Sequence, residues 1–364
     1  MIEPRIAIIV HGDRDSIEAA RARGLTQDYP EERLQFLWRD ASRLASARRW
    51  HRQIEAFKPQ VLYLINTAMP GALIAAYWWL VHRLPFVLDT GDVVWEMARR
   101  AGTQPRWKLP LLRGIETLSQ RLARLVVVRG TRHQAYLRQQ GCAHTAVIRD
   151  GYVPAPAFPA SATADLRHRL GLDEALVVGV MGSLVWSPRL QICYGWDLIQ
   201  ALAQLQDLPV RGLIIGDGNG RSWLQALARQ RHVQDRIVFC GRIPYAEVPR
   251  YLQLMDVALS TQTNNLPGQV RTTGKLPEYM ASERFILASR VGEAALLLPE
   301  IMLLDYDGEV DREYPCKLAG RIRQLCHQRE LLSARHALPE IARQNCSYEV
   351  LSRQFRTVVS ALPA

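Results

Sequence analysis

The chain has 364 residues, which is more than one ordinary hydrophobic core holds and suits two α/β domains of roughly 150 residues each. Hydrophobic residues make up 48% and charged residues 22%, a composition that excludes a disordered or fibrous protein. The net charge is +11, and the six cysteines are dispersed, without a C-x-x-C pair or a histidine at zinc-finger spacing. We therefore expect reduced cysteines and no bound metal.

The first half of the chain alternates short apolar runs with helical patterns, the order of a parallel sheet with crossover helices. Strands are predicted at residues 5–10, 35–38, 61–65, 86–88, 125–128 and 146–148. The amino terminus turns polar directly after Val10, too early for a signal peptide, so residence in the cytoplasm is expected.

One uncharged stretch of 21 residues, 61–81, has the length of a membrane span. Four turn-forming residues interrupt its middle: Asn66, Thr67, Pro70 and Gly71. We therefore expect a buried strand followed by a helix from residue 71, as in a soluble α/β domain.

Residues 97–149 form a basic region that contains eleven basic residues and one acidic residue, Glu116. Five apolar residues recur there at helical spacing: Leu111, Ile115, Leu118, Leu122 and Leu125. This pattern predicts a helix that packs its apolar side inward and covers the other side with arginines. The positive surface is either an ordinary solvated face or a contact for anionic lipid headgroups or an anionic acceptor. No nucleic-acid-binding motif accompanies the charge, so nucleic acid is not an expected partner.

Residues 151–163 contain three prolines and suit an exposed connection between domains. Beyond them the strand pattern starts again, at residues 177–181, 210–215, 237–240, 257–259, 285–288 and 302–304. Each half is thus predicted to be a doubly wound, Rossmann-like unit. Ligands of such units bind at the carboxyl ends of the strands, and two facing units create a cleft.

Three loops of the second half follow predicted strands and contain candidate donor-binding residues. In the first loop, Gly182 and Ser183 let backbone amides approach a phosphate and Arg189 adds charge, unless that arginine only faces solvent. A glycine-rich turn at Gly216 and Gly218 either receives a nucleotide or merely reverses the chain. It lacks the G-x-G-x-x-G fingerprint, so a nicotinamide dinucleotide site is not supported.

In the third loop, Arg242 and Ile243 follow the strand at 237–240 and are placed to offer backbone groups to the edge of a nucleotide base.

The fourth loop of the second half is the most informative. Thr272, Thr273 and Gly274 lead into a predicted helix whose unpaired amides and positive dipole end suit a diphosphate. Lys275, one of only four lysines in the chain, is suited to a phosphate oxygen. Glu278 either accepts hydrogen bonds from ribose hydroxyls or simply stabilises the helix dipole.

These loops carry a resemblance to a known family. Four segments of the second half resemble, in order and spacing, the donor domain of family-four glycosyltransferases: GSLVWSPR, LIIGDGNGRSWLQALA, DRIVFCGRIPYAEVPRYLQLMDVALS and GKLPEYMASERFILASRVGEA. Four segments of the first half resemble the first domain of the same family: FKPQVLYL, LPFVLDTGD, IETLSQRLARLVVVRG and VIRDGYVPAPAF. The closing segment SYEVLSRQFRTVVSAL is similar to the family's helix that crosses back to the first domain. The resemblance implies the GT-B fold, two Rossmann-like domains across a cleft, at residues 1–160 and 161–345, with residues 346–364 returning.

The resemblance also implies a function. It implies a retaining glycosyltransferase that uses a nucleoside-diphosphate sugar as co-substrate, needs no obligatory metal or other cofactor, and acts on a sugar or lipid-linked acceptor. Synthesis of cell-surface polysaccharide or glycolipid, at the inner face of the membrane, would suit such an enzyme. Arg189 and Lys275 are placed on the diphosphate and Glu278 on the ribose. Asp92 matches a loop position that turns towards the acceptor and reacting sugar, or else it caps a helix.

Two departures from the family pattern leave alternatives open. Val270 stands eight residues before Glu278, where the family often has a glutamate that holds the transferred sugar. Gly12 stands alone where the family has a glycine pair, so His11 and Asp13 are either acceptor-side residues or ordinary loop residues. The alternative functions are a non-catalytic GT-B partner subunit and a sugar-nucleotide epimerase.

Overall fold

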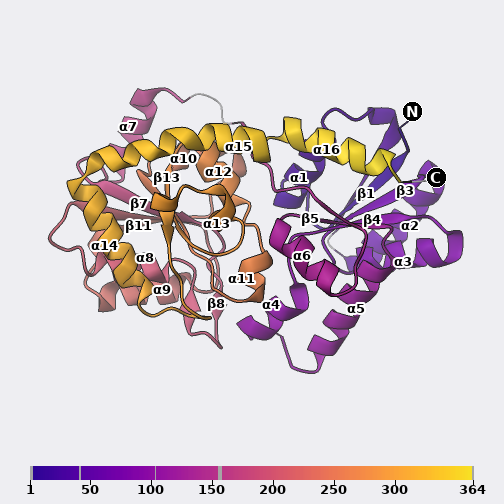
Figure 1. Cartoon of the computed structure of the whole chain (residues 1–364), viewed down its shortest axis with the longest axis horizontal. Coiled ribbons are helices and arrows are strands. Elements are labelled where there is room, and N and C mark those ends of the chain that lie inside the picture. The colour runs from indigo at the N-terminus through magenta and orange to yellow at the C-terminus, as the bar shows by residue number, and fades with distance from the viewer. Residues whose placement is uncertain (1–2, 41, 103, 155–157, 363–364) are drawn as a thin grey trace.

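The computed structural model describes residues 3–40, 42–102, 104–154 and 158–362. Two parallel sheets of six strands form two domains that lie side by side, each flanked by helices (Figure 1). The predicted fold class, α/β with two doubly wound domains, is confirmed.

The first sheet has the order β2-β1-β3-β4-β5-β6. Its strands are β1 (Ile6–Val10), β2 (Leu34–Trp38), β3 (Val61–Ile65), β4 (Phe86–Thr90), β5 (Leu125–Val128) and β6 (Thr145–Val147). The helices between them are α1 (Ile17–Leu25), α2 (Arg43–Phe57), α3 (Gly71–His82), α4 (Val94–Ala101), α5 (Lys108–Leu122) and α6 (Thr131–Gln139). The chain reverses its direction of winding between β1 and β3, so loops at this switch point leave a crevice.

Strand β1 shows why the sheet is buried on both faces. Ile6, Ile8 and Val10 pack into a core beneath α1, whereas Ala7 and Ile9 pack into a second core on the opposite face. Successive side chains of a strand point to opposite faces, so a continuous apolar run is what a sheet covered on both sides requires.

The second sheet has the order β11-β10-β7-β12-β13-β14, with its switch point between β7 and β12. Its strands are β7 (Leu176–Met181), β10 (Val210–Ile215), β11 (Ile237–Gly241), β12 (Val257–Ser260), β13 (Phe285–Ser289) and β14 (Leu303–Leu304). Its helices are α7 (Ala160–Arg169), α8 (Trp196–Leu202), α9 (Arg221–Gln230), α10 (Val248–Leu252), α11 (Leu266–Val270), α12 (Lys275–Ala281), α13 (Ala294–Leu297), α14 (Tyr314–His327) and α15 (Leu338–Cys346). A hairpin of β8 (Trp186–Ser187) and β9 (Ile192–Cys193) interrupts the connection from β7 to α8.

The closing helix α16 (Tyr348–Ser360) returns to the first domain, as the yellow end of the chain shows in Figure 1. Leu351, Phe355 and Val359, spaced four residues apart, lie on one face and are buried in the core beneath α1. The Ser347 hydroxyl accepts a hydrogen bond from the Val350 amide and so begins this helix.

Two expectations from the sequence have different outcomes. The uncharged stretch forms β3 and α3, as predicted, and no described helix is long and apolar enough to cross a membrane. The packing predicted for α5 is wrong at two positions, because the Leu111 and Leu118 side chains are 58% and 52% exposed. Helix α5 packs against α3 and α4, and no described element covers the side that carries these leucines.

The crossing helix provides a test of stability. Phe355→Ala should lower the free energy of unfolding by about 3–5 kcal/mol, the usual range for a buried aromatic ring. The ring is fully buried and meets Tyr29 and Tyr63 edge-on, so its removal leaves a cavity. Urea denaturation of Phe355→Ala beside Arg353→Ala, whose side chain is 66% exposed, is the measurement. Equal midpoints for the two variants would contradict this packing.

Candidate active site

The switch point of the second sheet brings together two residues that are far apart in the sequence. Strand β7 ends at Met181, and a Cβ atom built at Gly182 would lie 3.1 Å from the Lys275 amino nitrogen. The same atom would lie 3.3 Å from the ring of Tyr194, a residue that the sequence analysis did not identify. Glycine therefore lets the backbone after β7 approach the lysine closely.

Lys275 lies against an aromatic face and has no ion-pair partner among the described residues. Its Nζ is 3.6 Å from the centroid of the Tyr194 ring, whose hydroxyl donates a hydrogen bond to the Leu259 carbonyl. Lys275 forms no ion pair with any described carboxylate. Burial lowers the pKa of the ammonium to about 7, the positive charge of Arg271 contributes, and the buried Asp197 carboxylate opposes this shift in part. An anion bound here would restore the charged form.

The start of α12 leaves room for a ligand. A Cβ atom at Gly274 would meet no atom within 4 Å, and the buried Thr273 hydroxyl has no hydrogen-bond partner among the described residues. The Thr272 hydroxyl, by contrast, donates to the Arg129 carbonyl of the first domain at 2.9 Å. Thr272 thus joins the domains, and only Thr273 offers a free hydroxyl.

Glu278 lies on the same helix as Lys275 and is 7% exposed. Its carboxylate accepts hydrogen bonds from the Tyr245 hydroxyl and the Val153 amide. Burial raises the pKa of this carboxyl to about 7. Tyr245 follows β11 in the loop that contains the exposed Arg242 and the half-buried Ile243, so the third and fourth candidate loops meet at Glu278.

The glycine-rich turn has a packing explanation. A Cβ atom at Gly216 would lie 1.9 Å from the Gly182 carbonyl oxygen, and one at Gly218 would lie 2.3 Å from that of Leu184. The two loops therefore pack backbone against backbone, which by itself requires glycine. Ser183, between them, is exposed. Contact of these residues with a nucleotide stays a prediction.

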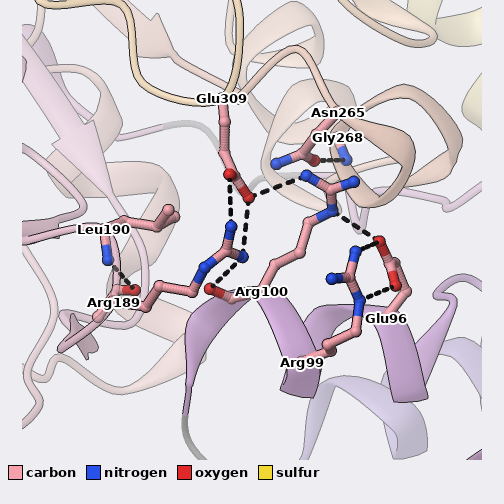
Figure 2. Close-up of polar contacts among 9 residues, drawn as sticks. Glu96, Arg99, Arg100, Arg189, Leu190, Asn265, Gly268 and Glu309 are labelled. Carbon is pink, nitrogen blue, oxygen red and sulfur yellow. Dashed lines mark hydrogen bonds and ion pairs between the residues drawn. The ribbon is translucent and has the colours of Figure 1, made fainter.

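Arg189 takes part in an ion-pair cluster that joins the domains (Figure 2). Its guanidinium donates to both Glu309 oxygens, at 3.2 and 2.9 Å, and to the Arg100 carbonyl at 3.3 Å. The Arg100 guanidinium meets the same Glu309 carboxylate at 3.0 Å. The diphosphate role of Arg189 stays a prediction, and it requires that its pair with Glu309 open.

Asp92 faces the second domain rather than capping a helix. Its carboxylate lies 3.2 Å from the Arg271 Nε, just before α12. The first amides of α4, those of Val94 and Trp95, donate instead to the Glu116 carboxylate, each at 3.1 Å. The helix-cap alternative for Asp92 is therefore wrong, whereas a role towards the reacting sugar stays a prediction.

On the first domain, His11 lies at the end of β1, beside the switch point. It is 7% exposed, its ring meets Trp50 edge-on at 5.9 Å, and neither ring nitrogen has a described partner. Burial lowers the pKa of His11 to about 4, so the ring is neutral at pH 7. A Cβ atom at Gly71 would lie 2.5 Å from its Nε2, so glycine at the start of α3 makes room for the ring.

Gly12 and Asp13 shape the turn that follows. The Asp13 carboxylate accepts from the Asp15 amide at 3.1 Å, and a Cβ atom at Gly12 would lie 2.1 Å from the Ser16 hydroxyl. Ser16 caps α1. Local contacts in this turn thus explain why glycine and aspartate stand at these two positions. A contact of either residue with the acceptor stays a prediction.

A further domain contact has no local signal in the sequence. Glu293 of the second domain is 1% exposed, and its carboxylate accepts from the Thr131 amide at 2.7 Å and from Arg149 at 3.1 Å. The residue preceding α6 is Gly130, which has no side chain to cap the helix. Glu293 supplies that cap from the other domain, 162 residues along the chain from Thr131.

Comparison with known proteins agrees with the predicted family. Residues 175–328, most of the second domain, match the model of a family described as Glycosyl transferases group 1. The resemblance to glycosyltransferases is confirmed. Over 160 residues the chain is 29% identical to the 2-deoxystreptamine glucosyltransferase of Streptomyces kanamyceticus, an alignment that covers 42% of this chain and 38% of that protein. The chain thus spans well under half the length of this curated relative.

Solved structures share the fold over almost the whole chain. HepE of Anabaena in complex with UDP-glucose matches with a TM-score of 0.76 and 16% identity, over 99% of this chain and all of that one. The sucrose-phosphate synthase of Thermosynechococcus elongatus matches with a TM-score of 0.75 and 16% identity, over 98% and 99% of the two chains. These likenesses confirm the GT-B fold.

The lowered pKa of Lys275 makes anion binding depend on pH. A diphosphate favours the ammonium form and raises its pKa, so binding should take up protons, and affinity should fall by up to about tenfold per pH unit above pH 7. Calorimetric titration of uridine diphosphate at about pH 7.5 and about pH 8.5, in buffers of different ionisation enthalpy, measures both effects.

Lys275→Met should lose this proton uptake, and Lys317→Met, a surface lysine paired with Asp307 and Asp311, should keep it. Unchanged uptake in Lys275→Met would place the titrating group elsewhere.

Proposed function

We propose that the chain is a retaining glycosyltransferase that moves a sugar from a uridine-diphosphate sugar to an acceptor hydroxyl. The observation that carries the proposal is Lys275, which lies without an ion pair to a described carboxylate beside Gly182 at the switch point of the matched domain. Glu278 lies three residues further along the same helix, within reach of a ribose. HepE, which shares the fold, is described in complex with UDP-glucose, and this supports uridine as the base.

The proposed chemistry depends on the departing diphosphate. The bond between the anomeric carbon and the phosphate oxygen breaks, and a bond forms between that carbon and the acceptor oxygen on the same face. The acceptor proton passes to the departing phosphate oxygen. Lys275 stabilises the negative charge that develops on the diphosphate, in a site where little water competes. Asp92, on the opposite domain, orients the acceptor.

Val270 requires another residue to hold the transferred sugar. Val270 is the last residue of α11, and its apolar side chain is 2% exposed, so it makes no polar contact with a sugar. Thr273 has the free buried hydroxyl nearest in sequence to Lys275. We assign to Thr273 a hydrogen bond with a hydroxyl of the transferred sugar.

The enzyme is further proposed to work on cell-surface glycan or glycolipid at the inner face of the membrane. The basic region at 97–149 supports this, because Arg106, Arg113 and Arg121 are exposed on or beside α5. Such arginines attract an anionic membrane surface or an anionic acceptor.

Incubation with a panel of UDP-, GDP- and ADP-sugars, with and without soluble and lipid-linked acceptors, tests the activity. A transferase releases nucleoside diphosphate in proportion to acceptor, and Lys275→Ala should lower that rate by roughly 10²–10³-fold. Lys317→Ala is the matched control. Conversion of the sugar nucleotide without acceptor would instead show an epimerase, and tight binding without turnover a partner subunit.

Transfer is also expected to proceed without a divalent metal. Among the residues that the structure describes, no three His, Cys, Asp or Glu side chains come together as a metal site. Lys275 is placed to supply charge that a metal gives the diphosphate in other transferases. Turnover measured in EDTA should stay within about twofold of the untreated rate. Loss of activity in EDTA, regained with magnesium or manganese, would contradict the proposal.

A further inference from the structure

A groove of about 1510 Å³ runs between α4, α5 and the rim of the second domain. We call it the α5 groove. Its walls combine large apolar side chains with arginines, among them Trp95, Leu109, Leu111, Leu118, Arg106 and Arg113. Among the described residues that line it there is no carboxylate. A ligand that fits this surface has both an apolar part and a negative charge.

The apolar part of the groove is exposed to solvent. Leu111 and Leu118, seven residues apart, lie on one face of α5 and are 58% and 52% exposed. Trp107, just before the helix, extends this stripe and is 72% exposed. Aligned apolar side chains of this size in water mark a contact surface more often than a free one.

The arginines of the groove are available to an anion. Arg106, Arg113 and Arg121 are exposed, and none forms an ion pair with a described carboxylate. The Arg113 guanidinium lies 4.9 Å from the centroid of the Trp95 ring, which holds it at the groove wall. Arg99 differs, because Glu96 in α4 already binds it.

The groove leads to the place where the two domains meet. Arg189, on the hairpin that follows β7, lines its far end, and a Cβ atom at Gly102 would lie 3.2 Å from the Arg189 Cβ. This hairpin belongs to the same loop as Gly182, beside Lys275. The groove and the donor site are thus bordered by the same loop of the second domain.

We infer that the α5 groove binds the lipid phosphate of a lipid-linked acceptor. The hydrocarbon chain lies on Leu111 and Leu118, and the phosphate is bound by Arg113 and Arg121. A sugar without a lipid would leave the leucines without an apolar partner, and a cationic acceptor is repelled by the arginines. The inference rests on the proposed function, since it names the acceptor of that reaction.

Farnesyl phosphate, farnesol and inorganic phosphate are the probes, added below micellar concentration to the full chain with saturating uridine diphosphate to occupy the donor site. Fluorescence of Trp95 and Trp107, which line or adjoin the groove, reports binding. Farnesyl phosphate should bind at least about tenfold more tightly than either other probe, because only it uses both parts of the groove.

Two paired variants with matched controls test the assignment. Leu111→Ser with Leu118→Ser, and Arg113→Gln with Arg121→Gln, should each weaken farnesyl phosphate about tenfold or more. Leu73→Ser on α3, where the leucine is also 52% exposed, and Arg229→Gln, exposed on α9, should have no effect. All four replaced groove residues are exposed, so the folded state is retained.

Three outcomes would overturn the inference. Equal binding of inorganic phosphate would indicate an anion patch without a lipid groove. Binding to vesicles of anionic phospholipid, without binding of monomeric farnesyl phosphate, would indicate a flat membrane surface. An equal loss of farnesyl phosphate affinity in the control variants would show that the groove residues do not form the binding site. If instead farnesyl phosphate binds as expected but UDP-sugars neither bind nor turn over, the proposed function fails and the groove remains.

Discussion

The candidate site depends on one lysine that forms no ion pair with a described carboxylate. A largely buried ammonium group is unfavourable unless a negative charge meets it, and Lys275 lies on the face of Tyr194 without an ion pair to any described carboxylate, although Asp197 acts on its charge from a greater distance. The pKa of about 7 is the consequence, because the neutral amine avoids much of the desolvation penalty. In the proposed function a diphosphate supplies the missing charge, and Lys275 lies close to Gly182 at the end of β7, where nucleotide ligands of such sheets lie.

The contacts between the domains fall into two kinds. Glu293 is 1% exposed, and its carboxylate binds the start of α6 and Arg149. Separating the domains at this contact would leave a buried carboxylate unpaired. The cluster around Glu309 is open to water, with the Arg189 side chain 42% exposed, and an exposed pair of this kind stabilises by only about 0–1 kcal/mol. The rim can therefore open to admit substrates while Glu293 keeps the domains together.

Local pattern was enough to predict the alternation of strands and helices. It also selected Lys275 and Glu278 as candidates, which the structure places on one helix beside the end of β7, because that signal lies within one loop and one helix turn. Tyr194, Tyr245 and Glu293 were missed, since each meets its partner only when distant segments pack. The error at Leu111 and Leu118 has a related cause. Helical spacing predicts an apolar face, but only the neighbouring elements decide whether anything covers it.

The most direct test of this account is a crystal structure of the chain with uridine diphosphate. We expect a β-phosphate oxygen at about 2.7–2.9 Å from the Lys275 Nζ, the distance of a charge-assisted hydrogen bond. The ribose hydroxyls should meet Glu278, with the Tyr245 hydroxyl moved from its present contact with that carboxylate. A diphosphate bound on the arginines of α5, with Lys275 still facing only Tyr194, would contradict the account.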